Sequence, residues 1–301
     1  MFTQPSMTKL FGTSGFRDLA PERINPELAY HVGASFATYH QNQGTLVIGY
    51  DTRETSVMLR EALASGIMSA GCDVIDIGQV PTPLLSYCAR ELDCAMGVMI
   101  TASHNPPEYN GIKGYDEKGM EWTPDREEMV ETLILDRSYK LVDWDKVGSC
   151  YERTDVAHSY IQAALRYLGK VSGGSGGLRI AVDTANGSGY KLTPYLLRHL
   201  GCQVISVNAQ PDGHFPAHSP EPTMEILQSV SGMVAGVAAM VVQDGDADRV
   251  AFIDDKGKPV HSDRIFAYFA KRALEENRKG TVVTTVDTSL LLDEIVEEYG
   301  G

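Results

Sequence analysis

The chain has 301 residues, which at about 100–200 residues per domain is enough for two domains or for three small ones. Its 43% hydrophobic and 22% charged residues are ordinary globular values and exclude a disordered or fibrous protein. With 26 Lys and Arg against 40 Asp and Glu, the net charge of -14 excludes a general attraction to nucleic acid or to an anionic membrane, so a phosphate ligand would need locally placed cations or a metal ion.

Neither the first residues nor the cysteines indicate an exported or membrane-embedded protein. Residues 1–10 lack a basic region followed by an apolar run, and the longest apolar stretch, residues 233–242, is too short to span a bilayer. The five cysteines are scattered without a CxxC pair, which favours reduced thiols over a disulfide framework or a zinc site. We expect a cytoplasmic protein.

The N-terminal third of the sequence predicts a helix and then a strand–helix–strand unit. Asn25-Pro26 is typical of an N-cap followed by proline at the first helical position. The β-branched run at 45–52 ends in Asp-Thr and is followed by a helical stretch and by a second apolar strand, GCDVIDIG, at 71–78.

The same plan returns later in the chain. Residues 178–184 form an apolar run that ends in Asp-Thr, a helical stretch follows, and GCQVISVN at 201–208 is the next strand. Such strands alternating with helices are typical of parallel βαβ units covered on both faces. Chance similarity between βαβ units is the alternative, but the shared Asp-Thr and Gly-Cys pairs favour a structural duplication.

A third copy begins at residues 281–288, TVVTTVDT, and its helix has Leu291, Ile295 and Tyr299 on one face. The sequence stops where the other copies turn into their second strand, which leaves a parallel strand without its crossover partner. We therefore expect a C-terminally truncated form of a longer protein.

The segments between these units set the expected domain limits. Thr123-Pro124 opens another helix, residues 138–153 have no clear period, and a helix at 155–169 precedes the Gly/Ser stretch 172–177, which we expect to be flexible. The sequence thus predicts an α/β protein built of repeated βαβ domains with mixed or parallel sheets and helices on both faces. Two domains are complete and a third is cut short: residues 1–150, 151–253 and 254–301.

The loop TASHNPPEYNGIKGY, residues 101–115, follows the apolar run that ends at Ile100, and so it lies at the end of a strand where open α/β sheets place ligands. Its prolines and Asn-Gly pair predict a rigid turn that exposes the Ser103 hydroxyl beside His104, with Lys113 able to fold back. A nucleophilic serine needs activation and a nearby cation, which these residues supply. The alternative is a polar loop with an incidental serine.

The segment DGDADR, residues 244–249, places three carboxylates at alternate positions between two strands. They can converge on one hard cation such as Mg²⁺. An EF-hand calcium loop is excluded because the sixth position is Arg249 rather than Gly and the twelfth is Asp255 rather than Glu. A solvated acidic turn is the alternative, but three unpaired carboxylates repel one another, which favours a bound cation.

Two further segments carry weaker signals. KLFGTSGFRD, residues 9–18, offers glycines, hydroxyls and the Arg17 guanidinium to a phosphate, although a tight turn stabilised by an arginine explains it equally well. PDGHFPAHSPEP, residues 211–222, is predicted as an ordered connection in which His214 and His218 are structural rather than catalytic.

Together these segments resemble the α-D-phosphohexomutase family, which includes phosphoglucomutase, phosphomannomutase and phosphoglucosamine mutase. TASHNPPEYNGIK is similar to the family's phosphoserine loop, DGDADR to its metal loop, and FGTSGFRD and PDGHFPAHSPEP to further family segments in the same order. The resemblance covers essentially the whole chain. Two features differ from the family. Gln243 stands where the family usually has an apolar residue, and the family's loops for sugar recognition and for binding the substrate phosphate are absent from these 301 residues.

The resemblance implies a role for each matching residue. Ser103 would carry the phosphoryl group, with His104 beside it, while Arg17 and Lys113 would assist its transfer. The metal ligands would be Ser103, Asp244, Asp246 and Asp248, and Arg249 would contact the substrate.

The implied reaction is reversible phosphoryl transfer between O1 and O6 of a hexose phosphate, with Mg²⁺ as cofactor and a hexose 1,6-bisphosphate as activator and intermediate. A metal-dependent phosphohydrolase that uses Ser103, or a metal-binding fragment without activity, are the alternatives. We expect little activity from this chain alone, and its residues do not name the preferred sugar among glucose, mannose and glucosamine phosphates.

Overall fold

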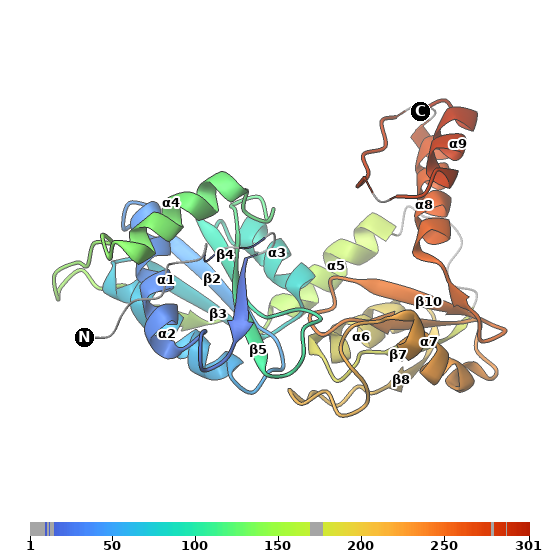
Figure 1. The fold of residues 1–301 in the computed structure, drawn as a ribbon, viewed down its shortest axis with the longest axis horizontal. Helices are drawn as coiled ribbons and strands as arrows, with labels where there is room; N and C mark the ends of the chain where they lie inside the picture. The colour runs from blue at the N-terminus through green and yellow to red at the C-terminus, as the bar shows by residue number, and fades with distance from the viewer. Residues whose placement is uncertain (1–9, 11, 13–14, 169–176, 278–279, 287) are drawn as a thin grey trace.

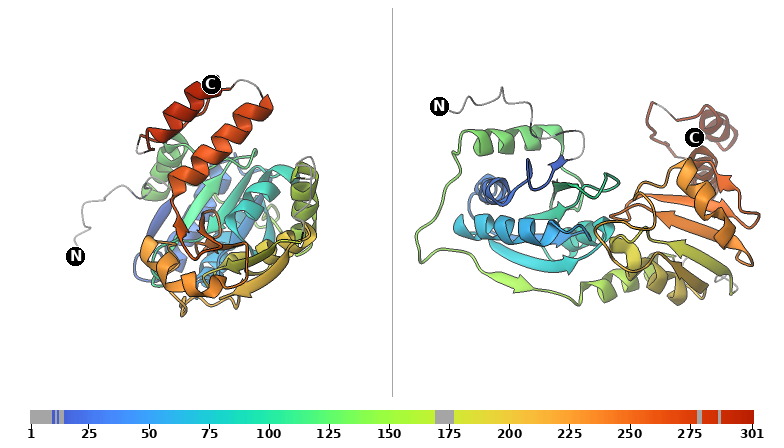
Figure 2. Two further views of the ribbon diagram at one scale, coloured as in Figure 1. Left: turned by 90° about the vertical axis from the view of Figure 1, so that its right-hand side faces the viewer. Right: turned by 60° about the horizontal axis from the view of Figure 1, so that its bottom comes forward.

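The computed structural model of this protein describes residues 10, 12, 15–168, 177–277, 280–286 and 288–301. Within them two β-sheets lie side by side along the long axis of the molecule (Figure 1). Helices α8 (Ser262–Asn277) and α9 (Leu291–Glu298) project from the second sheet as a separate pair, which both views of Figure 2 show.

The first sheet is mixed and has the strand order β1-β5-β4-β2-β3-β6. β2, β3, β4 and β6 run parallel, whereas β5 is antiparallel to both of its neighbours. Its strands are β1 (Phe16–Leu19), β2 (Thr45–Tyr50), β3 (Asp73–Gln79), β4 (Met96–Ile100), β5 (Tyr109–Tyr115) and β6 (Cys150–Glu152). The short edge strand β6 lies in the segment that we predicted as a connection without regular structure.

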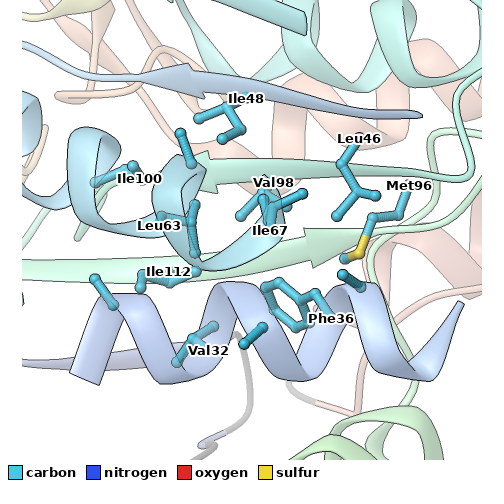
Figure 3. Close-up of a cluster of buried hydrophobic side chains, with 14 of the residues drawn as sticks. Val32, Phe36, Leu46, Ile48, Leu63, Ile67, Met96, Val98, Ile100 and Ile112 are labelled. Carbon is cyan, nitrogen blue, oxygen red and sulfur yellow. The ribbon is translucent and has the colours of Figure 1, made fainter. Parts of the chain in front are cut away.

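Helices cover both faces of this sheet, as predicted. They are α1 (Pro26–Tyr39), α2 (Ser56–Ser69), α3 (Thr82–Glu91), α4 (Pro124–Leu135) and α5 (Val156–Leu168). The predicted N-cap is confirmed, since the Asn25 side chain accepts a hydrogen bond from the Leu28 amide at 2.9 Å. In Figure 3, Val32 and Phe36 of α1 point towards Ile112 of the sheet, and all three side chains are buried. α3 and α5 pack on the opposite face.

The second sheet has the order β11-β10-β9-β7-β8. Its strands are β7 (Arg179–Asp183), β8 (Gln203–Val207), β9 (Ala239–Gln243), β10 (Val250–Asp254) and β11 (Pro259–Val260). Its helical elements are η1 (Ser188–Tyr190), α6 (Leu192–His199), α7 (Met224–Val230) and η2 (Ser231–Val234). α7 and η2 pack on one face, while Leu192 of α6 joins the core that α3 and α5 form on the first sheet.

The two sheets share one topology, which supports the predicted duplication. The order β5-β4-β2-β3 in the first corresponds to β10-β9-β7-β8 in the second, with the same parallel and antiparallel pairs. Gly71 and Gly201 of the two Gly-Cys pairs both have positive φ, at 91° and 88°, a backbone conformation in which glycine ends the preceding helix without steric cost. Consequently, the β4–β5 loop with Ser103 and the β9–β10 loop with the three aspartates are equivalent connections.

The predicted third copy is wrong in part. Residues 281–286 form no strand, because an isolated parallel strand has no neighbour to receive its hydrogen bonds. The helix does form, as α9, but its buried residue is Leu292, which packs with Ala267 and Ala270 of α8, whereas Leu291 of the predicted face is 37% exposed. The Gly/Ser stretch at 172–177 falls outside the described residues except for Gly177.

All five cysteines are free thiols, and three of them, Cys72, Cys88 and Cys94, are buried. Among the helices that the structure describes, none has the length and the apolar composition needed to cross a membrane.

Candidate active site at the junction of the two sheets

The β4–β5 loop and the β9–β10 loop meet where the two sheets adjoin. The Ser103 hydroxyl donates a hydrogen bond to Asp244 Oδ2 at 2.9 Å. On the neighbouring helix α3, the Thr82 hydroxyl donates to Asp246 Oδ2 at 2.7 Å, and the Thr82 amide donates to the Asp246 carbonyl at 3.0 Å. Both loops follow a strand at the same end of its sheet, which is where ligands bind in open α/β folds.

Ser103 is held in an unusual conformation. Its φ is +52°, in the left-handed region that costs a residue with a side chain about 1 kcal/mol or more. The residue is only 1% exposed, and its hydroxyl also lies 3.0 Å from Arg249 Nη2 and 3.4 Å from His104 Nδ1. The strained backbone thus aims the hydroxyl across the junction at charged groups, and backbone strain of this kind clusters at functional sites.

Asp244, Asp246 and Asp248 point into one small space. One oxygen from each lies within 4.8 Å of the others. Burial, and after it the charges of the two other aspartates, raises the pKa of Asp244 well above its usual range, and burial with the charge of Asp246 raises that of Asp248. Burial also opposes ionisation of Asp246, but Lys113 and the Thr82 hydroxyl outweigh it and lower the pKa of Asp246.

These carboxylates fit a divalent cation with oxygen ligands. Asp244 and Asp246 are completely buried, and Asp246 Oδ1 has no hydrogen-bond partner. A buried anionic oxygen without a partner is costly, and a hard cation would remove that cost. Mg²⁺ binds such carboxylates and keeps part of its water shell, so Ser103 and the three aspartates are a suitable ligand set.

Three cations lie among these acidic groups. Lys113 Nζ, 2% exposed in its side chain, is 3.4 Å from Asp246 Oδ2 and 3.5 Å from Asp248 Oδ2. Arg249 Nε is 3.3 Å from Asp244 Oδ2. Arg17 of β1 pairs in register with Gly111 of β5, and its charge lowers the pKa of Arg249, although burial is the larger cause.

The expectation of three unpaired carboxylates is wrong, because Lys113 and Arg249 pair with them. With all three aspartates ionised, the charges of Lys113, Arg249 and the nearby Arg17 would offset theirs. A phosphoryl group on Ser103 would add a charge of about -1.5 to -2, which a divalent cation would balance.

Two sequence models of the phosphoglucomutase/phosphomannomutase family match this chain. That of α/β/α domain I matches residues 8–140, and that of α/β/α domain II matches residues 158–257. The chain belongs to the α-D-phosphohexomutase family.

Relatives of this phosphohexomutase chain carry names for different sugar phosphates. A phosphoglucomutase/phosphomannomutase of Thermococcus kodakarensis is 44% identical over 98% of this chain and 66% of the relative. A phosphopentomutase of the same organism is 42% identical over 97% of this chain and 64% of the relative. The chain therefore spans about two thirds of the length of these relatives.

A solved structure has the same fold. The crystal structure of a phosphoglucomutase/phosphomannomutase family protein from Burkholderia thailandensis matches with a TM-score of 0.87 and 28% identity, over 97% of this chain and 65% of that one. The mixed α/β architecture predicted from the sequence is thus confirmed for this family member.

Two groups that hold the site of this phosphohexomutase chain together were not predicted from the sequence. Thr82 begins α3 and carries the hydrogen bonds to Asp246 described above. Arg53, the residue after Asp51-Thr52, has a side chain that is fully buried and is ion-paired with Asp51 at 3.0 Å. The position of Arg53 just after a buried strand was the signal that could have identified it. An arginine buried there needs an acceptor for each of its N–H groups, and Asp51 and the neighbouring loop carbonyls supply them.

The structure places the two segments with weaker sequence signals, residues 9–18 and 211–222, differently. Thr13 and Ser14 of residues 9–18 lie outside the described residues, whereas Arg17 lies in β1 as given above. In residues 211–222, the His214 side chain is 74% exposed, while the buried His218 pairs with Asp183 at 3.1 Å. His214 bonds to Asp212 of its own loop and lies 3.8 Å from Glu54, whereas His218 bonds to Asp183 at the end of β7, which is consistent with the structural interpretation of both histidines.

Proposed function

We propose that this chain carries the phosphoserine and the metal site of a phosphosugar mutase, which transfers a phosphoryl group reversibly between O1 and O6 of a hexose phosphate. The observation that carries the proposal is the 2.9 Å contact between Ser103 Oγ and Asp244 Oδ2, across the junction of the two sheets and among three carboxylates and three cations. In this proposal residues 1–150 supply the phosphorylated serine and residues 151–253 supply the metal loop.

The metal ligands would be Asp244, Asp246, Asp248 and an oxygen of phosphorylated Ser103. Mg²⁺ bound there would supply positive charge to the phosphoryl oxygens during transfer. The short contact between the serine and Asp244 supports this set, because the serine and the carboxylates already lie within reach of one ion.

The side chains around Ser103 suit phosphoryl transfer, in which positioning and charge neutralisation do most of the work. Arg249 Nη2 is 3.0 Å from the Ser103 hydroxyl, and Lys113 is held near the same point by Asp246 and Asp248. In the proposal Lys113 and Arg17 stabilise the charge of the moving phosphoryl group, and Arg249 contacts the sugar phosphate.

The transfer balances without another reactant. The bond from phosphorus to Ser103 Oγ breaks as a bond to the sugar hydroxyl oxygen forms, and the proton lost by that hydroxyl ends on Oγ. His104, whose Nδ1 is 3.4 Å from Oγ, is placed to return this proton. The hexose 1,6-bisphosphate then turns over and gives its other phosphoryl group back to Ser103.

One assay separates this proposal from hydrolysis. The chain is incubated with Mg²⁺ and glucose, mannose, glucosamine or ribose 1-phosphate, with a trace of hexose 1,6-bisphosphate. Sugar 6-phosphate, or the pentose 5-phosphate, and free phosphate are then measured together. Ribose 1-phosphate is included because one relative is named a phosphopentomutase.

The proposal expects isomerised sugar phosphate in excess of free phosphate, in small amount from this chain and in larger amount from a version extended to the length of its relatives, with the hexoses preferred. Free phosphate alone would instead identify a phosphohydrolase that uses Ser103. A chain that binds Mg²⁺ and gives neither product, even when extended to the length of its relatives, would be a metal-binding protein without this activity.

A further inference from the structure

Arg53 uses its entire guanidinium to hold the loop that carries Ser103. Nη1 donates to the carbonyls of Pro106 and Tyr109 at 2.5 and 2.8 Å, and Nη2 donates to those of Ser103 and Asn105 at 3.0 and 2.6 Å. The remaining N–H, on Nε, donates to Asp51 Oδ2 at 3.0 Å. All five donors of the side chain are therefore used, four of them on one loop.

Asp51 neutralises this buried arginine and extends the network to the serine amide. Its Oδ2 accepts from the Thr101 hydroxyl at 2.7 Å, and the Thr101 oxygen in turn accepts from the Ser103 amide at 2.8 Å. The Ser103 peptide is thus held on both sides: its N–H through Thr101 and its carbonyl by Arg53. These are the groups that fix the left-handed backbone at +52°.

The network also reaches the second sheet. The Arg53 guanidinium lies 5.1 Å from the centre of the Phe215 ring, in the 211–222 segment. On the metal loop, a side chain at Gly245 would come within 2.7 Å of the Ser103 carbonyl oxygen and 3.5 Å of the Phe215 ring. The same carbonyl thus contacts both Arg53 and the loop of aspartates.

We propose that Arg53 is a positioning residue for phosphoryl transfer at Ser103: it fixes the direction of the hydroxyl relative to the three aspartates without touching the reacting atoms. This inference rests on the proposed function. No other side chain fits this role as well, because an arginine is the side chain that presents five donors in one rigid fork. A lysine would keep the charge beside Asp51 but could not bind four carbonyls at once.

The test compares Arg53→Lys and Thr101→Val with the unchanged chain. Arg60→Lys is the matched control, because that arginine also pairs with a mostly buried aspartate, Asp76 at 3.1 Å, but lies on α2. Each variant is mixed with Mg²⁺ and glucose 1,6-bisphosphate. The rate of phosphate transfer to Ser103 at saturating sugar, the half-saturating sugar concentration, the Mg²⁺ affinity and the thermal midpoint are measured.

We expect Arg53→Lys to slow the transfer about 100-fold, the loss typical of a displacement of about 1 Å, and Thr101→Val to slow it about 10-fold. The half-saturating sugar concentration and the Mg²⁺ affinity should stay unchanged, because the metal loop and the substrate contacts are intact. A purely structural role would instead lower the rate, the metal affinity and the thermal midpoint together.

Two results would overturn the inference alone: normal transfer in both Arg53→Lys and Thr101→Val, or parallel loss of rate and Mg²⁺ affinity. If Arg53→Lys does not fold, Thr101→Val decides, since it removes one hydroxyl from the same network. No phosphate on Ser103 in the unchanged chain would overturn the proposed function, and the inference with it.

Discussion

Adding a single methyl group at Gly245 should push the two loops of the site apart. A Cβ at this position would lie 2.7 Å from the Ser103 carbonyl oxygen and 3.3 Å from Pro220 Cβ. An ordinary carbon contact is about 3.5 Å, so Gly245→Ala requires the loops to separate by roughly 0.5–1 Å. The Ser103 carbonyl cannot retreat freely, because Arg53 Nη2 binds it at 3.0 Å.

Overpacking of this kind costs about 1–3 kcal/mol, so Gly245→Ala should lower the urea midpoint of unfolding. The displacement should slow phosphorylation of Ser103 by about 10–100-fold, while Mg²⁺ binding by the aspartates changes little. Gly232→Ala is the control, since a methyl group there would have no heavy atom within 4 Å and the φ of Gly232 is not positive. Equal stability and equal phosphorylation rates in the two variants would refute the close contact between the loops.

Three further predictions concern the metal site, a histidine and the length of the chain. Asp246→Asn should weaken Mg²⁺ binding, measured by calorimetry, at least about 100-fold, because loss of even an outer-shell partner costs about 10–100-fold in metal affinity. Its circular dichroism spectrum should match that of the unchanged chain, and an unchanged Mg²⁺ affinity would contradict the assignment of Asp246 as a ligand. Burial lowers the pKa of His218, but its hydrogen bonds to Asp183 and the Ser219 carbonyl outweigh burial and raise it. The ion pair of His218 with Asp183 therefore contributes stability below about pH 6.5, and this contribution is lost as the pH rises through the raised pKa. His218→Gln should consequently lower the free energy of unfolding more at pH 6 than at pH 9. An equal loss at both pH values would contradict this. This chain should show little mutase activity compared with a version extended to the length of its relatives, because remote contacts that orient the sugar can lower the activation barrier by about 7–11 kcal/mol. Equal turnover of the two would contradict this.

The local parts of the structure were predictable from the sequence. Apolar runs that end in Asp-Thr identified β2 and β7, and apolar runs that begin after Gly-Cys identified β3 and β8. Asn25-Pro26 identified the start of α1, because these signals act within a few residues. The two loops that carry Ser103 and the aspartates were also recognisable, since turn residues and charges directly follow buried strands.

Interactions between distant segments were not predictable in this way. The pairing of Lys113 with Asp246 joins residues 133 positions apart, and the bonds from Arg53 to the serine loop span 50–56 positions. No local pattern reports such contacts. The strand expected at 281–288 failed for a related reason, because a strand depends on a neighbour that local propensity does not supply.

The central claim is that Ser103 carries the phosphoryl group. It is tested most directly by incubating the chain with Mg²⁺ and glucose 1,6-bisphosphate and locating the phosphate by peptide mass spectrometry, with Ser103→Ala as the control. The account predicts phosphate on the peptide that contains Ser103 and none in the Ser103→Ala variant. Phosphate on another residue, or equal labelling of the variant, would contradict it.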